Sequence, residues 1–223
     1  DVKLAANSTR TDAQGNASLV VTSLKSGSVV ITAQTAESAP VRADSARFIA
    51  DLTTAKMTEM AADSVTAVAN GTDGITVRTT VVDANDNPVD GAKVDWAVSP
   101  SGATLSDTTS VTNASGEASV TLRSETAGEY SLQATFGSNT LRVTKLTFTG
   151  DTTTAKLANL TADKTTGIVA DSDTVLLTAT VVDSHQNPVP GVAVNWSSSD
   201  AADVTLTPVS ATTNAQGQAE ARF

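Results

Sequence analysis

The stretch "VVDANDNPVDGAKVDW", which runs from Val81 to Trp96, has a near copy one hundred residues later in the chain. The copy, "VVDSHQNPVPGVAVNW", runs from Val181 to Trp196. In both copies an apolar run leads into turn-forming Asp, Asn and Pro, followed by a tryptophan that alternates with valines. This order predicts a strand, a turn and a second strand that directs its tryptophan into a core.

A second marker, Thr-Asp/Asn-Ala-x-Gly, occurs three times, as "TDAQG", "TNASG" and "TNAQG". The resulting period of 100–101 residues is the size of an Ig-like sandwich and exceeds the periods of solenoid repeats. The phase of the markers predicts the C-terminal part of an Ig-like domain over residues 1–50, a complete domain over 51–150, and a domain lacking its last strands over 151–223. This phase is expected of a segment of a longer tandem array. If the protein instead ends at these residues, head-to-tail strand exchange would let residues 1–50 of a neighbouring molecule complete the core of 151–223.

Within the complete repeat, period-2 alternation of apolar residues predicts about seven short strands, each with one buried face. The strands are expected at 56–62, 75–82, 92–98, 103–111, 117–123, 130–136 and 141–148, and no helix is expected. Short strands separated by frequent turns favour an all-β fold of Greek-key sandwiches. Because the linkers hold no Gly/Ser-rich or Pro-rich filler, tandem immunoglobulin-like β-sandwiches are expected to form an elongated rod.

The composition excludes several classes of function. The net charge of −10 argues against nucleic-acid binding, which needs a basic surface to displace counterions. The chain has no cysteine and no stretch long enough for a membrane helix, and we recognise no signal peptide. Its single histidine, His185, falls in a predicted exposed turn without a counterpart in the other repeat, so we expect no enzyme activity.

The Asp/Asn-rich turn admits two interpretations. Asp83, Asn85 and Asp86 offer the oxygen ligands that calcium prefers. The second copy has Gln186 in place of Asp86, whereas what the two copies share are turn formers, including Pro88 and Pro188. We therefore favour a structural turn over a metal site and expect no cofactor. Calcium at the domain junctions, near residues such as Asp51, Asp63, Asp151 and Asp163, is a separate alternative.

Several other residues are assigned structural roles. Trp96 and Trp196 alternate with inward valines, so a core position is favoured over an exposed sugar-stacking one. The three marker glycines are expected to supply the positive φ that closes a hairpin turn, and Tyr130 to pin a corner of the fold to the backbone through its hydroxyl. The marker glycines are Gly15, Gly116 and Gly217.

Four separate stretches, "AVANGTDGITV", "DNPVDGAKV", "TNASGEASVTL" and "SETAGEYSL", resemble the bacterial Ig-like (Big-1 type) domains of the intimin/invasin adhesins, or inverse autotransporters. The resemblance covers essentially the whole chain. It implies a protein of the bacterial cell surface, anchored in the outer membrane through a barrel domain that is absent from this chain. It also implies that a host cell-surface receptor is bound by distal domains outside this chain.

We therefore expect an extracellular stalk segment of an adhesin. Two alternatives stay open: direct binding of a host glycan or protein by these domains, and homotypic self-association in biofilm formation. The low-charge, Thr-rich stretch 140–149 offers a sheet edge for such pairing.

Overall fold

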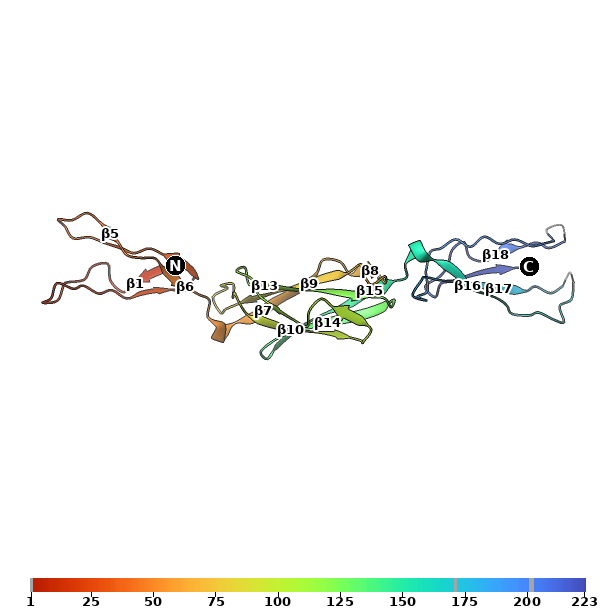
Figure 1. Ribbon diagram of the computed structural model, residues 1–223, viewed down its shortest axis with the longest axis horizontal. Helices are drawn as coiled ribbons and strands as arrows, with labels where there is room; N and C mark the ends of the chain where they lie inside the picture. Colours follow the sequence, from red (N-terminus) through yellow and green to blue (C-terminus); the bar gives the residue numbers. More distant parts are fainter. Residues whose placement is uncertain (1, 171, 201–202) are drawn as a thin grey trace.

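The computed structural model describes residues 2–170, 172–200 and 203–223. Three β-rich units follow one another along one long axis, with the N-terminal unit at one end and the C-terminal unit at the other (Figure 1). Among the described residues the helical elements are two three-residue 3-10 turns, η1 (Leu52–Thr54) and η2 (Thr152–Thr154), one at each linker. The prediction of an all-β tandem Ig-like fold is confirmed. None of these helical elements has the length and hydrophobicity needed to cross a membrane.

The middle unit is a sandwich of two sheets. One sheet has the strand order β12-β10-β14-β15-β8 and the other the order β11-β13-β9-β7. The bounds of the strands are β7 (Lys56–Ala62), β8 (Thr66–Val68), β9 (Ile75–Val82), β10 (Lys93–Ser99), β11 (Ala103–Leu105), β12 (Thr109–Val111), β13 (Glu117–Ser124), β14 (Gly128–Phe136) and β15 (Asn139–Thr149). All pairings are antiparallel except that of β8 with β15.

Aliphatic side chains fill the space between the two sheets. Along β9, Ile75, Val77 and Val81 are fully buried, and their neighbours in sequence are at least partly exposed. Burying one such side chain stabilises a fold by about 1.5–3 kcal/mol relative to leaving it exposed. Tyr130 meets Phe148 edge to face, with ring centroids 5.8 Å apart, at one end of this core.

Two features of the middle unit differ from the expected strands. The segment 103–111 is two strands, since β11 pairs with β13 and β12 pairs with β10 in the opposite sheet. The chain therefore crosses between the sheets at this point. The structure also contains a strand that was not expected, β8. It is only three residues long and its partner in β15 is far away in sequence, so no local sequence pattern predicts it.

The N-terminal unit contains three two-stranded ladders, β1-β2, β3-β6 and β4-β5. Their strands are β1 (Val2–Leu4), β2 (Val21–Ser23), β3 (Gly27–Val29), β4 (Thr32–Ala33), β5 (Val41–Arg42) and β6 (Ala46–Phe48). The pairing of Gly27 with Phe48 has the same register as the pairing of Gly128 with Phe148 in the middle unit. The repeat seen in the sequence is thus also a repeat of strand pairing.

The C-terminal unit contains one four-stranded sheet of order β16-β17-β19-β18. Its strands are β16 (Lys156–Ala162), β17 (Leu176–Val182), β18 (Thr207–Pro208) and β19 (Gln218–Arg222). The order matches that of the four-stranded sheet in the middle unit. Leu157 on β16 is 57% exposed, whereas Met57, its equivalent on β7, is 3% exposed beneath the second sheet.

The two tryptophans differ in one hydrogen bond, which predicts a stabilising substitution. The Nε1 of Trp96 donates to the Oγ of Ser110 at 2.8 Å, whereas the buried Nε1 of Trp196 has no partner. The sequence repeat places Ala211 where Ser110 stands. We expect Ala211→Ser to raise the free energy of unfolding of the C-terminal unit by about 1 kcal/mol, measured by urea denaturation of the full chain. Ser110→Ala should cost a similar amount, and no change in either variant would contradict the prediction.

The marker glycines predict a graded cost of added side chains. A Cβ at Gly116, where φ is +74°, would meet the carbonyl oxygen of Val81 and the ring of Pro88. A Cβ at Gly15, where φ is +83°, would meet nothing within 4 Å. We expect Gly116→Ala to destabilise by about 2–4 kcal/mol and Gly15→Ala by about 1 kcal/mol, because only the former adds a clash to the left-handed strain. Equal costs in thermal unfolding would show that the packing against Pro88 is unimportant.

Candidate functional site at the domain junctions

The Asp/Asn-rich loop after β9 is organised around one buried carboxylate. Asp83 is 2% exposed, and its Oδ1 accepts hydrogen bonds from the backbone nitrogens of Asn85 at 2.8 Å and Asn87 at 2.9 Å. The side-chain Nδ2 of Asn87 donates to Oδ2 at 2.9 Å. The same Oδ2 accepts from the backbone nitrogen of Asp51 in the linker at 3.0 Å. Asp83 thus ties its own turn to the linker that precedes the sandwich.

Asn87 extends this network into the preceding unit. Its Nδ2 also donates to the carbonyl oxygen of Leu24 at 2.9 Å, and its Oδ1 accepts from the backbone nitrogen of Ser26 at 2.9 Å. One amide side chain therefore satisfies a donor and an acceptor on the main chain that joins β2 to β3. Lys25, between those two residues, donates from Nζ to the carbonyl oxygen of Asn85 at 2.6 Å.

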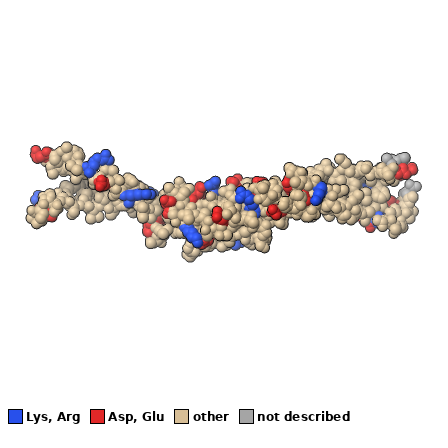
Figure 2. Space-filling view, in the orientation of Figure 1, with Lys and Arg blue, Asp and Glu red and all other residues tan. Residues whose placement is uncertain are grey.

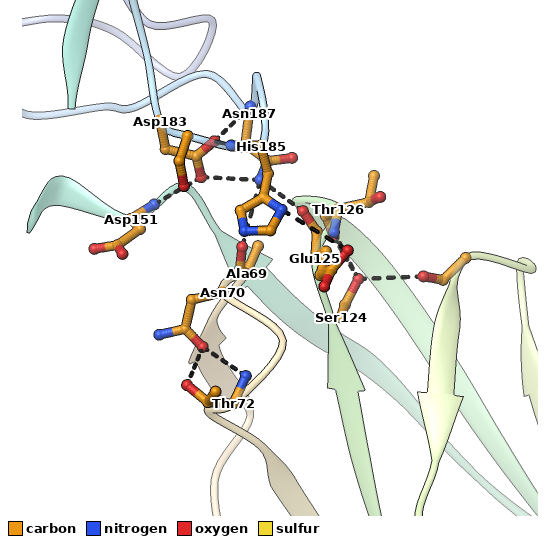
Figure 3. A network of polar contacts seen from close by, with 12 residues as sticks. Ala69, Asn70, Thr72, Ser124, Glu125, Thr126, Asp151, Asp183, His185 and Asn187 are labelled. Atoms are coloured by element: carbon orange, nitrogen blue, oxygen red, sulfur yellow. Dashed lines mark hydrogen bonds and ion pairs between the residues drawn. The ribbon is translucent and has the colours of Figure 1, made fainter. Parts of the chain in front are cut away.

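The second junction repeats the arrangement (Figure 3). Asn187 donates from Nδ2 to the carbonyl oxygen of Glu125 at 2.8 Å and accepts at Oδ1 from the backbone nitrogen of Ala127 at 2.7 Å. Asp183 accepts from the Nδ2 of Asn187 at 2.9 Å and from the backbone nitrogen of Asp151 at 3.1 Å. We call each pair, Asp83 with Asn87 and Asp183 with Asn187, an Asp–Asn clamp.

The linkers are as regular as the clamps. Asp51 and Asp151 begin the 3-10 turns, and each accepts at its side chain from the backbone nitrogen two residues on. In the second linker Gly150 is buried, and a Cβ there would collide with the carbonyl oxygen of Pro188. The connections between units are therefore folded against the next sandwich and are not free spacers.

Hydrogen bonding controls the ionisation of the clamp carboxylates. Burial opposes the charged form, but hydrogen bonds from the Asn87 side chain and from the backbone of Asp51, Asn87 and Asn85 outweigh it and lower the pKa of Asp83 well below its ordinary value of 3.8. The pKa of Asp183 is lowered in the same direction, where the bonds from Asn187, Asp151 and His185 outweigh burial. Both clamps are consequently anionic at neutral pH.

These lowered pKa values predict how the protein responds to acid. A carboxyl group whose pKa is lower in the folded state than in the unfolded state stabilises the fold. The full stabilisation is present when the pH is above the unfolded-state pKa, here 3.8, and it is lost as the pH falls through the folded-state pKa. We expect urea midpoints to be insensitive to this linkage between neutral pH and about pH 5, and to fall in stronger acid. The double variant Asp83→Asn, Asp183→Asn should flatten the acid limb. An unchanged acid limb in that variant would contradict the assignment.

The proposed calcium ligands differ in their burial and in the groups that surround them. Asp83 is buried and faces N–H groups, whereas Asp86 is exposed, with a φ of 58° at a tight position of the turn. Gln186 adopts the same conformation, with a φ of 67°. Within the described parts of the chain, no group of three His, Cys, Asp or Glu side chains is arranged to hold a metal ion.

The tryptophans and Tyr130 lie in the sandwiches, and the two prolines lie in the turns at the junctions. Trp96 is 5% exposed and Trp196 is partly buried. The hydroxyl of Tyr130 donates to the carbonyl oxygen of Thr126 at 3.1 Å, in the segment that Asn187 clamps. Pro88 and Pro188 each bridge back to the end of the preceding strand, at Val82 and Val182.

From the sequence, Asn87 and Asn187 were expected only to form the turn, and the marker threonines Thr112 and Thr213 were assigned no role. The hydroxyl of Thr112 donates to the carbonyl oxygen of Val89 at 2.6 Å, and Thr213 makes the same bond in the next repeat. The available signal was the repeat itself, because both Asp–Asn pairs persist while the residues between them change.

The two junctions are not identical in their outer contacts. His185 lies 3.8 Å from the Oε2 of Glu125 across the second junction (Figure 3). The first junction has a pocket of about 490 Å³ on its surface, lined by residues that include Phe48, Ile49 and Leu52. Ile49 is 79% exposed. Charged side chains are scattered along the visible face of the molecule and form no large patch there (Figure 2).

The fold and its junctions define a class of protein, namely tandem Ig-like sandwiches that dock on one another through short, folded linkers. The family described as Bacterial Ig-like domain (group 1) matches residues 58–149 and 157–223, which is more than half of the chain. The chain belongs to this family.

The relatives described next are adhesins of Escherichia coli. The inverse autotransporter adhesin YeeJ of Escherichia coli K12 is 31% identical over 213 residues, 95% of this chain and 9% of YeeJ. Intimin of Escherichia coli O127:H6 is 40% identical over 126 residues, 56% of this chain and 13% of intimin. The chain thus spans about a tenth of the length of these relatives. The solved structure of invasin, described as a bacterial integrin-binding protein, aligns with a TM-score of 0.52 at 18% identity over 95% of this chain and 43% of that chain. The resemblance to the intimin/invasin family is confirmed.

Proposed function

We propose that this chain is a stiff, non-catalytic stalk segment of a bacterial adhesin anchored in the outer membrane. In this proposal it holds a receptor-binding part of the adhesin away from the cell surface. One observation carries the proposal: two successive junctions are closed by the same Asp–Asn clamp, with equivalent atoms and nearly equal distances. A stalk needs such repeated, ordered junctions, whereas an enzyme or a binding module does not.

The clamp suits tandem repeats because it recognises main-chain atoms. Asn87 bonds the carbonyl oxygen of Leu24, and Asn187 bonds that of Glu125, so the side chain at this position is free to vary. A serine holds the recognised turn in shape: the Oγ of Ser124 accepts from the backbone nitrogen of Thr126 at 3.0 Å, and Ser23 does the same in the first unit. Units of different surface can therefore dock in the same way.

The relatives support an adhesin role. Both YeeJ and intimin are cell-surface adhesins by name or family, and intimin has been solved as a C-terminal fragment in complex with the intimin-binding domain of Tir. A related adhesin thus binds a receptor, and we propose that the receptor contact of this protein lies in domains other than those of this chain. We place the chain itself outside the cell.

Small-angle X-ray scattering of the full chain tests the proposal. A stiff stalk predicts a pair-distance distribution with an extended tail, matching the arrangement in Figure 1. The variant Asn87→Ala, Asn187→Ala should shorten the average dimension and broaden the distribution. A compact wild-type profile, or a wild-type profile as broad as that of the double variant, would overturn the stalk proposal.

Self-association is the alternative for which the structure offers a specific surface. The sheet edge expected over residues 140–149 is partly closed, because β8 pairs with Thr147, Phe148 and Thr149. The earlier part of β15 borders β7, where the backbone nitrogen of Met57 donates to the Oδ1 of Asn139 at 2.8 Å. Residues 140–146 of β15 form no strand ladder on that side, so an edge remains there for pairing. Concentration-dependent dimerisation in analytical ultracentrifugation would favour self-association over an inert spacer.

A further inference from the structure

The sequence contains one Asn-Gly pair, Asn70–Gly71, and the structure places it at the second junction (Figure 3). The pair lies in the loop between β8 and β9, within the same polar network as Asn187. We propose that Asn70 is a site of spontaneous deamidation whose rate is controlled by docking of the C-terminal unit. This deepens the stalk proposal by adding a regulation of the same junction.

The chemistry requires only these two residues and water. The backbone nitrogen of Gly71 attacks the side-chain carbon Cγ of Asn70, forming a C–N bond. The side-chain nitrogen departs as ammonia and carries away the proton lost by Gly71. Water then opens the five-membered imide at either carbonyl, which leaves aspartate or isoaspartate at position 70. A glycine favours the attack because no side chain shields its nitrogen.

The Asn70 amide is polarised for this attack. Its Oδ1 accepts three hydrogen bonds, from the backbone nitrogen of Thr72 at 2.9 Å, the hydroxyl of Thr72 at 2.9 Å and the backbone nitrogen of Asp73 at 2.8 Å. Donors aimed at the oxygen of an attacked carbonyl stabilise the negative charge that develops there. The electrophile is therefore prepared in the folded protein.

The nucleophile, by contrast, is held back while the junction is closed. The backbone nitrogen of Gly71 donates to the carbonyl oxygen of Ser124 at 3.1 Å. Asn187 bridges the two segments that this bond joins, since its Nδ2 donates to the carbonyl oxygens of Glu125 at 2.8 Å and Ala69 at 3.5 Å. Loss of the Asn187 contacts frees the two segments to separate and releases Gly71 to react.

Once Asn70 is deamidated, the product opposes closure of the junction. The side chain of Glu125 lies over Gly71, within 3.0 Å of where a Cβ would sit. A new carboxylate at position 70 places a second negative charge beside Glu125, and isoaspartate also lengthens the main chain. The clamp residues themselves are protected, because Asn87 and Asn187 precede prolines, which have no N–H to act as the nucleophile.

The test follows amide loss in the full chain during incubation in mildly alkaline buffer, with peptide mass spectrometry that distinguishes isoaspartate. We expect Asn70 to lose its amide faster than any other asparagine, and Asn187→Ala to raise that rate about tenfold. That factor corresponds to the loss of about 1.4 kcal/mol of docking. The matched control, Asn87→Ala at the first junction, should react at the wild-type rate. Asn187→Asp, which keeps the size but replaces the donor, should behave like Asn187→Ala.

Three outcomes would overturn the inference. One is no amide loss at Asn70 in any variant, and another is equal rates in wild type and both Asn187 variants. The third is equal acceleration by Asn87→Ala, which would indicate general destabilisation. Because the readout is a covalent change at one residue, its failure is distinguishable from failure of the stalk proposal, which is read from the shape of the molecule.

Discussion

Replacing Asp83 by alanine is expected to lower the free energy of unfolding of the middle sandwich by about 3 kcal/mol. The substitution removes the acceptor for the backbone nitrogens of Asp51, Asn85 and Asn87 and for the Asn87 side chain. A buried donor left without an acceptor costs about 1–3 kcal/mol, and water reaches only some of these groups. The loss is measured by urea denaturation of the full chain, following the fluorescence of the core tryptophans.

Two variants make this prediction specific. Asp83→Asn keeps the shape and one acceptor oxygen but removes the charge, so we expect a smaller loss than for alanine. Asp90→Ala changes an exposed carboxylate in the same connection and should alter stability by no more than about 0.5 kcal/mol. If Asp83→Ala costs no more than Asp90→Ala, the carboxylate does not organise the loop.

Asn187→Ala is expected to convert the second junction into a hinge. It removes the bonds to Glu125 and Ala127, and each such bond contributes about 1 kcal/mol. The undocked population should therefore rise by a factor on the order of 10 to 100. The change acts between units, so the sandwiches themselves should retain most of their stability.

Distance measurements between spin labels detect such a hinge. The chain has no cysteine, so cysteines introduced at the exposed Ser119 and Thr207 are labelled without background. Wild type should give one narrow distance across the second junction, and Asn187→Ala a broad distribution. Asn87→Ala should leave this distance narrow, because it acts on the other junction. A narrow distribution in Asn187→Ala would show that the Asn187 clamp is not what orders the junction.

Strand positions could be predicted from the sequence wherever a strand has one buried face. The alternation through Ile75 and Val77 identified β9 because the inward residues there are apolar and the residues between them are polar. The repeat then transferred the assignment to β17. The short strand β8 gave no such signal, since it has three residues and pairs in parallel with a distant part of the chain.

For the clamp, the sequence allowed the turn to be predicted but not the contact between units, and the reason is physical. Asp83 and Asn87 read as turn formers, and they do form the turn. The contacts of Asn87 with the preceding unit, however, end on main-chain atoms of Leu24 and Ser26, and every non-proline residue carries those atoms. A contact with main chain leaves no signature in the partner's sequence. The persistence of Asn at 87 and 187, while Asp86 becomes Gln186, is the trace that remained.

Equivalence of the two junctions sets the symmetry of any longer array built from such units. When each unit contacts the next through the same atoms, each step along the chain applies the same rotation and the same translation. A head-to-tail contact of this kind does not close into a ring when the translation is large, and it generates a screw axis. The corresponding face of every unit then lies on a helical path around the stalk, so a neighbouring fibre or surface meets those faces at a regular angular interval.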